Sequence, residues 1–386
     1  MNKSKKVQIF FTLILCLCVS FTSVGCMDKK NPEEQLDAYI NQIYSHYYKP
    51  SPSMSVLVVD NGKAVYKKSF GYANIDTLEK ATPDTTYRLS STSKMFIAMA
   101  IIMLKERGQL DFDTKVCDIL DDFPEYGKEI TIKHLLEHKS GIKDFYNLTG
   151  LLNKQFDENN QVLDSDVYEM VKKAGSTNFP PGTSFQYSDT GYIMLGLIVE
   201  KVSGMKLSDF MSENIFKPLE MNDTVLYDKT LDNYIPNRAY GAEPDGTKYK
   251  FITKDQSYSS ATRSDGTVYT SIEDMYKWDQ ALYTDKLVRK ETLKEAYTPP
   301  DVAYPAGDYL ARWKYTCGWI FLKNDDGDLI QYHSGWTTGF STIYYRIPEK
   351  KRAIVVLSNM TDDDYAYNLP TKIAEIYGFG SNIKEW

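Results

Sequence analysis

The spacing of hydrophobic and polar residues changes from helical to alternating near residue 50. Four apolar residues recur at helical spacing within residues 32–47, namely Leu36, Ile40, Ile43 and Tyr47. This spacing predicts an amphipathic helix. Residues 54–60 and 63–70 then alternate with a period of two, and the turn-forming pair Asn61-Gly62 joins them. We therefore predict a helix followed by a β-hairpin.

The rest of the chain is helical in pattern through its middle and strand-like towards its end. An apolar run over residues 92–107 predicts a long buried helix. Further helices are predicted in the middle at 132–139, 165–174 and 192–203, the last stopped by Gly204. Strands are predicted at 318–323, 329–333, 341–347 and 353–359, followed by a helix at about 370–377.

Strands at both ends with helices between them predict one discontinuous α/β domain of the α+β sandwich type. Its antiparallel sheet would come from about residues 30–107 and 261–386. The helical part, about residues 108–260, would be an insertion beside the sheet. A ligand would bind in a cleft between the two parts.

The first 25 residues have the pattern of a signal peptide. Three lysines precede an apolar run from Ile9 to Phe21, which at 13 residues is shorter than the roughly 20 that a membrane-spanning helix needs. The small residues Ser23 and Gly25 precede Cys26, as in bacterial lipoprotein signals, although those usually carry Leu where this chain has Ser23. We expect export, a mature domain of residues 26–386 and a lipid on Cys26.

Charge and cysteine content narrow the class of protein further. The net charge of −7 becomes −10 once residues 1–25, with three lysines and no acid, are removed. Nucleic acid and anionic lipid headgroups are therefore not expected partners. Cys117 and Cys317 would either form a disulfide or remain as two buried free thiols.

A Ser-x-x-Lys spacing places both side chains on one helix face, where a neutral lysine can take the serine proton. The spacing occurs four times, at Ser91/Lys94, Ser140/Lys143, Ser203/Lys206 and Ser381/Lys384. Only Ser91 opens a long apolar helix, which would bury Lys94 and favour its neutral form. The alternative is that Ser90, Ser91 and Thr92 are merely a helix cap.

The segment from Tyr87 to Phe96, Tyr-Arg-Leu-Ser-Ser-Thr-Ser-Lys-Met-Phe, resembles the active-site segment of the serine β-lactamase and penicillin-binding protein family. That family includes class C β-lactamases, D,D-carboxypeptidases and related esterases. Two further elements match it in order and spacing, Tyr187-Ser188-Asp189 and His333-Ser334-Gly335-Trp336, and the likeness spans roughly residues 35–380. Residues 135–141 and 266–271 are similar to the family as well.

The resemblance implies a role for each matched residue. Ser91 would attack a carbonyl carbon, while Lys94 and Tyr187 move protons, with a lowered pKa for the Tyr187 phenol beside an ammonium. The backbone N–H groups of Ser91 and Trp336 would hold the oxyanion. His333, Ser334 and Gly335 would lie on an edge strand that pairs with an extended substrate, and the His333 and Ser334 side chains would contact its carboxylate.

Two positions depart from the family pattern. Asp189 stands where the family usually has Asn, and its carboxylate would keep Lys94 protonated, which favours Tyr187 as the base. Ser188 is an alternative working hydroxyl. The third element is His-x-Gly rather than Lys-Thr-Gly, and His333 would be only partly charged at neutral pH. We therefore rank strong β-lactamase activity below peptide or ester hydrolysis.

Two other classes of function remain open in the sequence. His134 and His138 match an inverted zinc-protease pattern, His-x-x-Glu-His, although the helix would end at the second histidine. The alternative is that His138 only fixes the turn at Ser140-Gly141. The second open class is a non-catalytic protein that binds the cell wall.

The favoured interpretation is an exported serine hydrolase that forms an acyl-enzyme on Ser91. Its expected substrate is a D-Ala-D-Ala-type peptide or related amide, with small esters and β-lactams as alternatives. We expect no cofactor and no metal, a monomer, and a location outside the cell, where only the lipid anchor would contact the membrane.

Overall fold

The computed structural model describes residues 31–247, 249–300, 314–361 and 363–380. The chain divides into two compact units, residues 1–42 and residues 43–386. The described part of the first unit, residues 31–42, is most of helix α2 (Pro32–Tyr44). The expected signal peptide and Cys26 lie outside the described residues, so export and lipidation stay predictions.

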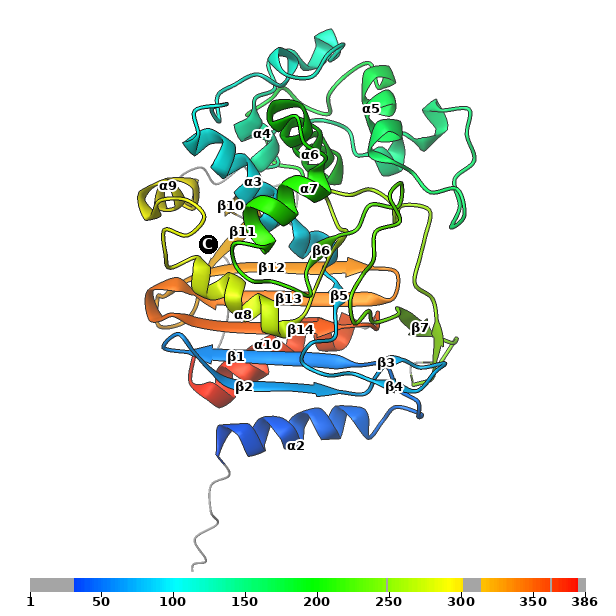
Figure 1. The fold of residues 1–386 in the computed structure, drawn as a ribbon, viewed down its shortest axis with the longest axis vertical. Coiled ribbons are helices and arrows are strands. Elements are labelled where there is room, and N and C mark those ends of the chain that lie inside the picture. Colours follow the sequence, from blue (N-terminus) through cyan, green and yellow to red (C-terminus); the bar gives the residue numbers. More distant parts are fainter. Residues whose placement is uncertain (1–30, 248, 301–313, 362, 381–386) are drawn as a thin grey trace, which may run out of the picture. The chain divides into compact units, whose positions relative to one another are not determined.

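The described helices and strands include the predicted ones in the predicted order (Figure 1). The helices are α2 (Pro32–Tyr44), α3 (Lys94–Glu106), α4 (Ile132–Leu136), α5 (Asp164–Lys173), α6 (Asp189–Ser203), α7 (Leu207–Met211), α8 (Ile272–Ala281), α9 (Lys290–Ala296) and α10 (Asp363–Tyr377). The strands are β1 (Met54–Asp60), β2 (Lys63–Phe70), β3 (Tyr72–Asn74), β4 (Glu79–Lys80), β5 (Tyr87–Arg88), β6 (Val225–Leu226), β7 (Ala242–Pro244), β8 (Phe251–Thr253), β9 (Val268–Thr270), β10 (Lys314–Thr316), β11 (Trp319–Lys323), β12 (Leu329–Thr337), β13 (Phe340–Ile347) and β14 (Arg352–Ser358).

The main sheet joins the two ends of the chain, as predicted. Its seven strands run in the order β10-β11-β12-β13-β14-β1-β2, and every neighbouring pair is antiparallel. The hairpin between β1 and β2 turns at Asn61 and Gly62, both with positive φ, as a two-residue turn requires. The expected fold class is confirmed.

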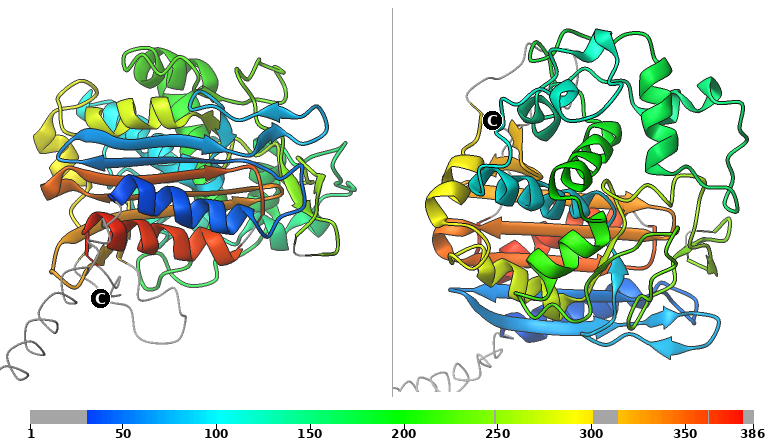
Figure 2. Two further views of the ribbon diagram at one scale, coloured as in Figure 1. Left: turned by 90° about the horizontal axis from the view of Figure 1, so that it is seen from below. Right: turned by 45° about the horizontal axis from the view of Figure 1, so that its top comes forward.

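Both faces of this sheet are covered, which explains its continuous apolar strands. All eight residues of β13 are buried, and six of the seven residues of β1 are buried. Helix α8 contacts β1 and β14, while α10 contacts β13 and β14, and the two helices lie on opposite faces (Figure 2). Strands buried on both faces lose the alternation of polar and apolar residues.

The helical region between the two sheet-forming parts contains α4 to α7, together with short strands that the sequence did not predict. Helix α6 contacts α3, and ends at Gly204, whose φ of 69° is the left-handed conformation common at helix ends. Among the described residues, no helix combines the length and apolarity needed to cross a membrane.

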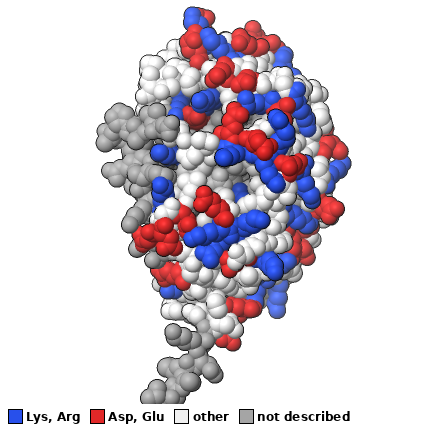
Figure 3. Space-filling model, turned by 90° about the vertical axis from the view of Figure 1, so that its left-hand side faces the viewer, with Lys and Arg blue, Asp and Glu red and all other residues white. Residues whose placement is uncertain are grey.

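One face of the molecule carries acidic and basic side chains side by side, without a broad area of either sign (Figure 3). Ion pairs near the surface include Arg289 with Glu106 at 2.9 Å, in which the Arg289 side chain is exposed and that of Glu106 is partly buried. Interspersed charges of this kind favour solubility.

Candidate active site

Ser91 and Lys94 are in hydrogen-bonding contact at the start of α3. Ser91 lies in a short 3-10 helix, Ser90–Ser93, that leads directly into α3. Lys94 Nζ is 3.0 Å from Ser91 Oγ, and the Lys94 side chain is fully buried. Neither the short helix nor α3 has a side-chain cap, so the capping interpretation of this serine cluster is not supported.

The other described Ser-x-x-Lys pairs do not form such a contact. Lys143 donates to Ala174 O and to Ser176 Oγ rather than to Ser140. Ser203 Oγ donates to the carbonyl of Val199 within its own helix. The fourth pair, Ser381 and Lys384, lies outside the described residues. The structure therefore distinguishes Ser91 from the serines that share its spacing.

Lys94 is held from three directions. Besides Ser91 Oγ, its Nζ contacts Asp189 Oδ1 at 2.6 Å and the backbone carbonyl of Asp265 at 3.0 Å. An ammonium has three N–H donors, so these three acceptors match its full capacity. The expectation that the Asp189 carboxylate lies beside Lys94 is confirmed.

The segment that carries Ser91 is packed tightly against the sheet. A Cβ placed on Gly335 in β12 would lie 2.0 Å from the carbonyl oxygen of Leu89, so only glycine fits there. Thr342 Oγ1 donates to the same Leu89 oxygen at 2.7 Å. Ser90, next to the nucleophile, has a φ of 53°, which is strained for a residue with a side chain. Close packing thus fixes where Ser91 points.

Tyr187 adjoins Lys94, but its phenol is not the acidic group that the sequence suggested. Lys94 Nζ lies 5.0 Å from the centre of the Tyr187 ring. Burial, and then the charge of Asp189, raise the pKa of Tyr187 well above its ordinary value, while the Ser91 hydroxyl lowers it. Within the described residues no hydrogen bond of normal geometry reaches the Tyr187 hydroxyl. The expected lowering of this pKa is wrong, because desolvation outweighs the nearby ammonium.

Asp189 and Ser188 take their positions from the N-terminus of α6. Ser188 Oγ accepts the N–H of Gly191 and caps the helix, while its part as an alternative working hydroxyl stays a prediction. Asp189 is the first helical residue, and its own N–H is donated to Asp144 Oδ2 at 2.8 Å. The helix start therefore fixes the direction in which the Asp189 carboxylate approaches Lys94.

Two further carboxyl groups, those of Asp144 and Asp265, lie near Lys94 and Asp189. Burial and the charge of Asp189 raise the pKa of Asp144 to about 6 and that of Asp265 to about 8. The Oδ1 atom of Asp265 is buried without a hydrogen-bond partner among the described residues. Neither acid is among the site residues predicted from the sequence. Asp265 directly precedes the family-like stretch 266–271, which was an available signal, whereas nothing local marks Asp144.

His333 is a buried neutral residue, not a partly charged group at a strand end. Its Nδ1 contacts the carbonyl of Ser334 at 2.7 Å, and its Nε2 contacts the Tyr315 hydroxyl at 3.0 Å. Burial, and then the charge of Lys94, lower its pKa to about 3. Both ring nitrogens are occupied, so His333 offers no charge to a substrate carboxylate, and that expected role is corrected.

Strand β12 is an edge over only part of its length. It is the third strand of the sheet, and residues Leu329 to Tyr332 pair with β11. From His333 to Thr337, described pairing is with β13 alone. The expected edge position of His333, Ser334 and Gly335 therefore agrees with the described pairing, although Leu329 to Tyr332 before them pair with β11. This free half carries Ser334, Gly335 and Trp336, whose side chain is 60% exposed.

The two histidines of the zinc-protease pattern are engaged in the local fold. His134 Nδ1 accepts the N–H of Thr131 as part of the α4 capping box. His138 follows the end of α4 with a φ of 56°, and its Nδ1 accepts the N–H of Ser188. Its ring packs 4.3 Å from that of Tyr187. No group of metal-ligating side chains occurs in the described parts of the chain.

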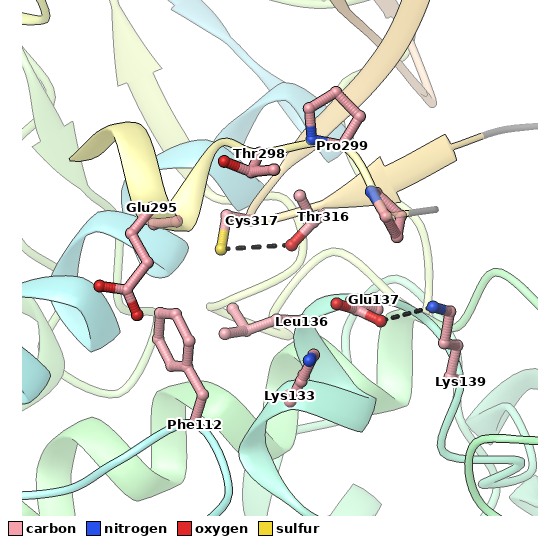
Figure 4. A pocket seen from close by; sticks show the side chains of 12 residues that line it. Phe112, Lys133, Leu136, Glu137, Lys139, Glu295, Thr298, Pro299, Thr316 and Cys317 are labelled. Carbon is pink, nitrogen blue, oxygen red and sulfur yellow. Dashed lines mark hydrogen bonds and ion pairs between the residues drawn. The ribbon is translucent and has the colours of Figure 1, made fainter. Parts of the chain in front are cut away.

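A cavity of about 470 Å³ is lined by Leu136, Glu137 and Lys139 on one side and by Thr316 and Cys317 on another (Figure 4). Its Glu137 and Lys139 side chains form a buried ion pair at 2.6 Å.

The β10–β11 turn connects this cavity to the active site. Cys317 and Gly318 form the turn with positive φ, and a Cβ on Gly318 would lie 2.5 Å from Met95 Cα. Cys117 and Cys317 are both free, Cys317 buried and Cys117 only partly buried.

Comparison with known proteins agrees with this geometry. The family model named Beta-lactamase matches residues 40–377. Penicillin-binding protein 4* of Bacillus subtilis is 32% identical over 335 residues, which cover 84% of this chain and 72% of that protein. A putative penicillin-binding protein of the same organism is 32% identical over 75% of this chain and 70% of its own length.

Solved structures show the same fold. The octameric penicillin-binding protein homologue from Pyrococcus abyssi has a TM-score of 0.73 at 26% identity, covering 90% of this chain and 78% of that one. A D-amino acid amidase from Ochrobactrum anthropi has a TM-score of 0.72 at 20% identity, covering 90% and 97%, a likeness of fold alone. With the paired Ser91 and Lys94, these matches lead to one conclusion: the chain belongs to the beta-lactamase family and is a serine hydrolase.

Proposed function

We propose that this protein is an exported serine hydrolase that forms an acyl-enzyme on Ser91 and acts on D-Ala-D-Ala-type peptides or related amides. The observation that carries the proposal is the 3.0 Å contact between Ser91 Oγ and the buried Lys94 Nζ. A serine becomes a competent nucleophile when a positioned base removes its proton.

In the resting site neither Lys94 nor Tyr187 is available as a base for Ser91. Asp189 stabilises the Lys94 ammonium, and the Tyr187 phenol is protonated because its pKa is raised. Lys94 must first release a proton to solvent, through the partly exposed Asp189 carboxylate 2.6 Å away, before it can accept that of Ser91. The protonated Tyr187 is then suited to donate a proton to the leaving group.

The negative charge that develops during acyl transfer would also have hydrogen-bond donors to receive it. As Ser91 Oγ bonds to the carbonyl carbon, the carbonyl oxygen becomes an anion that the N–H groups of Ser91 and Trp336 would receive. Fixed donors of this kind are each worth about 3–4 kcal/mol in related acyl-transfer sites. The C–N bond then breaks, and the amine leaves with a proton from Tyr187. The Lys94 ammonium then passes the proton taken from Ser91 to Tyr187, and water later releases the acyl group.

The substrate class is supported by the free half of β12. Main-chain groups from His333 to Thr337 lack a described partner on one side, so an extended peptide can add there as a strand. The relatives named penicillin-binding proteins support the same class. Neutral His333 supplies no cation, which favours peptidase or esterase activity over strong β-lactamase activity.

Intact-mass analysis after incubation with benzylpenicillin tests the acyl-enzyme directly. We expect an adduct on the wild type and none on Ser91→Ala. Slow release of that adduct would favour the peptidase type, whereas rapid penicillin consumption would favour the weak class C β-lactamase alternative. Turnover of small esters without any adduct would favour the esterase alternative. A wild type that neither reacts nor turns over any of these would favour the binding-protein reading.

We further propose that the mature chain begins at Cys26 and carries a lipid on its thiol, as the positive and apolar residues before it suggest. Detergent-phase partitioning of the expressed full chain tests this. We expect the wild type in the detergent phase and Cys26→Ser in the aqueous phase. Equal partitioning of the two would contradict lipidation.

A further inference from the structure

The loop of residues 263–266 supplies one of the three acceptors of Lys94. The Asp265 carbonyl accepts a hydrogen bond from Lys94 Nζ at 3.0 Å. A Cβ on Gly196 in α6 would lie 1.8 Å from Ser264 Oγ, so the loop packs directly on the backbone of this helix. The acceptor for Lys94 is therefore part of a closely packed segment.

Two arginines fix this loop from its other sides. Arg263 Nε is 2.8 Å from Asp164 Oδ2, and Arg263 Nη1 is 2.7 Å from Glu200 Oε1. Arg88, which is buried, donates from its Nε to Gly266 O at 2.9 Å. A planar guanidinium group bonded at several points holds its partners in one geometry. The backbone beside Lys94 is therefore held in place by contacts outside the catalytic residues.

The side chain of Asp265 has no cation of its own. It is buried, and its Oδ1 has no hydrogen-bond partner among the described residues. Lys94 Nζ contacts Asp189 Oδ1 at 2.6 Å, and the neighbouring Arg263 is paired with Asp164. Burying an unpaired carboxylate is costly, whereas the neutral acid is tolerated. The position of Asp265 therefore favours a carboxyl group that keeps its proton.

The other titratable groups nearby act in the same direction. They are Lys94 of α3, Asp164 of α5, Asp189 of α6, and the phenols of Tyr146 and Tyr187. Desolvation, and then the charge of Asp189, raise the pKa of both phenols, so they carry no charge. Burial, and then the charge of Asp189, raise the pKa of Asp265 to about 8, although the charge of Lys94 lowers it.

We propose that Asp265 is a positioning residue for Lys94, whose backbone carbonyl holds Nζ while its side chain stays neutral, so that Lys94 faces one carboxylate rather than two. Its effect on turnover rests on the proposed acyl-enzyme function. Lys94 must release a proton before it can accept that of Ser91, and a second carboxylate nearby opposes this release by attracting the ammonium. Ionisation of Asp265 therefore slows acylation.

The rate of acylation by benzylpenicillin, compared between the wild type and Asp265→Asn from pH 6 to pH 9, tests this role. Asparagine keeps the backbone carbonyl and the shape of the side chain, but it cannot ionise. Bond lengths place the carboxyl group of Asp265 within about 7 Å of Lys94 Nζ. Two unit charges about 7 Å apart change a rate about threefold even when they are screened as in water.

The ratio of the Asp265→Asn rate to the wild-type rate should therefore rise at least about threefold from pH 6 to pH 9, with a midpoint near 8. Asp144 is present in both proteins, so its own titration cancels in this ratio. The control is Asp326→Asn, an equal loss of charge in the exposed turn before β12, and its ratio should not change with pH. A ratio for Asp265→Asn that is constant or falls with pH would overturn the proposal.

NMR of the Lys94 Nζ resonance in Ser91→Ala follows the same coupling without turnover. We expect this resonance to shift between pH 7 and 9, and to lose the shift in the double variant Ser91→Ala, Asp265→Asn. The same response in both proteins would overturn the proposal, as would a constant resonance in Ser91→Ala even where Asp265→Asn does not fold. If the shift occurs as expected but benzylpenicillin forms no adduct on the wild type at any pH, the placement of Asp265 beside Lys94 is supported and the acyl-enzyme function fails.

Discussion

Replacing Asp189 by Asn removes the charge that holds the Lys94 ammonium. The two groups are 2.6 Å apart, Lys94 is fully buried and the Asp189 side chain is 16% exposed. At that distance the attraction between unit charges is about 1.6 kcal/mol in water and about 6 kcal/mol at an effective dielectric constant of 20. Even the smaller figure corresponds to about a tenfold change in the rate of a step in which this attraction must be broken.

The asparagine side chain keeps an acceptor for Lys94 Nζ, and the neutral amine is not penalised by burial. We therefore expect Asp189→Asn to be acylated by benzylpenicillin about tenfold faster than the wild type between pH 6 and 9. The assay is quenched-flow sampling with intact-mass detection, with substrate well below saturation so that chemistry determines the rate.

Two variants control for other effects. Ser91→Ala should give no adduct. Asp209→Asn makes the same change in the first turn of α7, away from Lys94, and should leave the rate unchanged. A rate for Asp189→Asn that equals or falls below the wild-type rate at every pH would refute the view that Asp189 keeps Lys94 from acting as a base.

Three further predictions follow from the packing and burial around the site. Gly335→Ala should slow acylation by about a hundredfold or more, since its Cβ would lie 2.0 Å from Leu89 O, whereas Gly150→Ala, with no heavy atom within 4 Å, should be neutral in the same assay. The raised pKa of Asp265, about 8, means that the folded protein binds more protons than the unfolded chain between about pH 4 and 8. The wild type should therefore lose stability as pH rises through this window, and Asp265→Asn should be more stable by about 1–3 kcal/mol at pH 9 in urea unfolding; an unchanged pH slope would contradict this. The imidazole resonances of His333, with a pKa near 3, should stay constant between pH 5 and 8 in NMR titrations, and a midpoint near 6.5 would contradict its burial.

Local sequence patterns were sufficient to predict most strands of the main sheet. The β1–β2 hairpin was predicted with its observed bounds, because alternation and an Asn-Gly turn act within a few residues. Strand β12 extends four residues beyond its predicted end at His333, and α8 was not predicted at all. These elements depend on pairing with β13 and on packing against β1 and β14, which lie far away in the sequence.

The active site was likewise predicted only in part from the sequence. The sequence by itself identified Ser91 and Lys94, since a three-residue spacing at a helix start brings two side chains together whatever the rest of the chain does. It also identified Asp189 as the neighbour of Lys94, through the order of family elements. Only the tertiary structure decided that Tyr187 stays protonated and that His333 is neutral, as protonation is set by burial and by charges from distant segments.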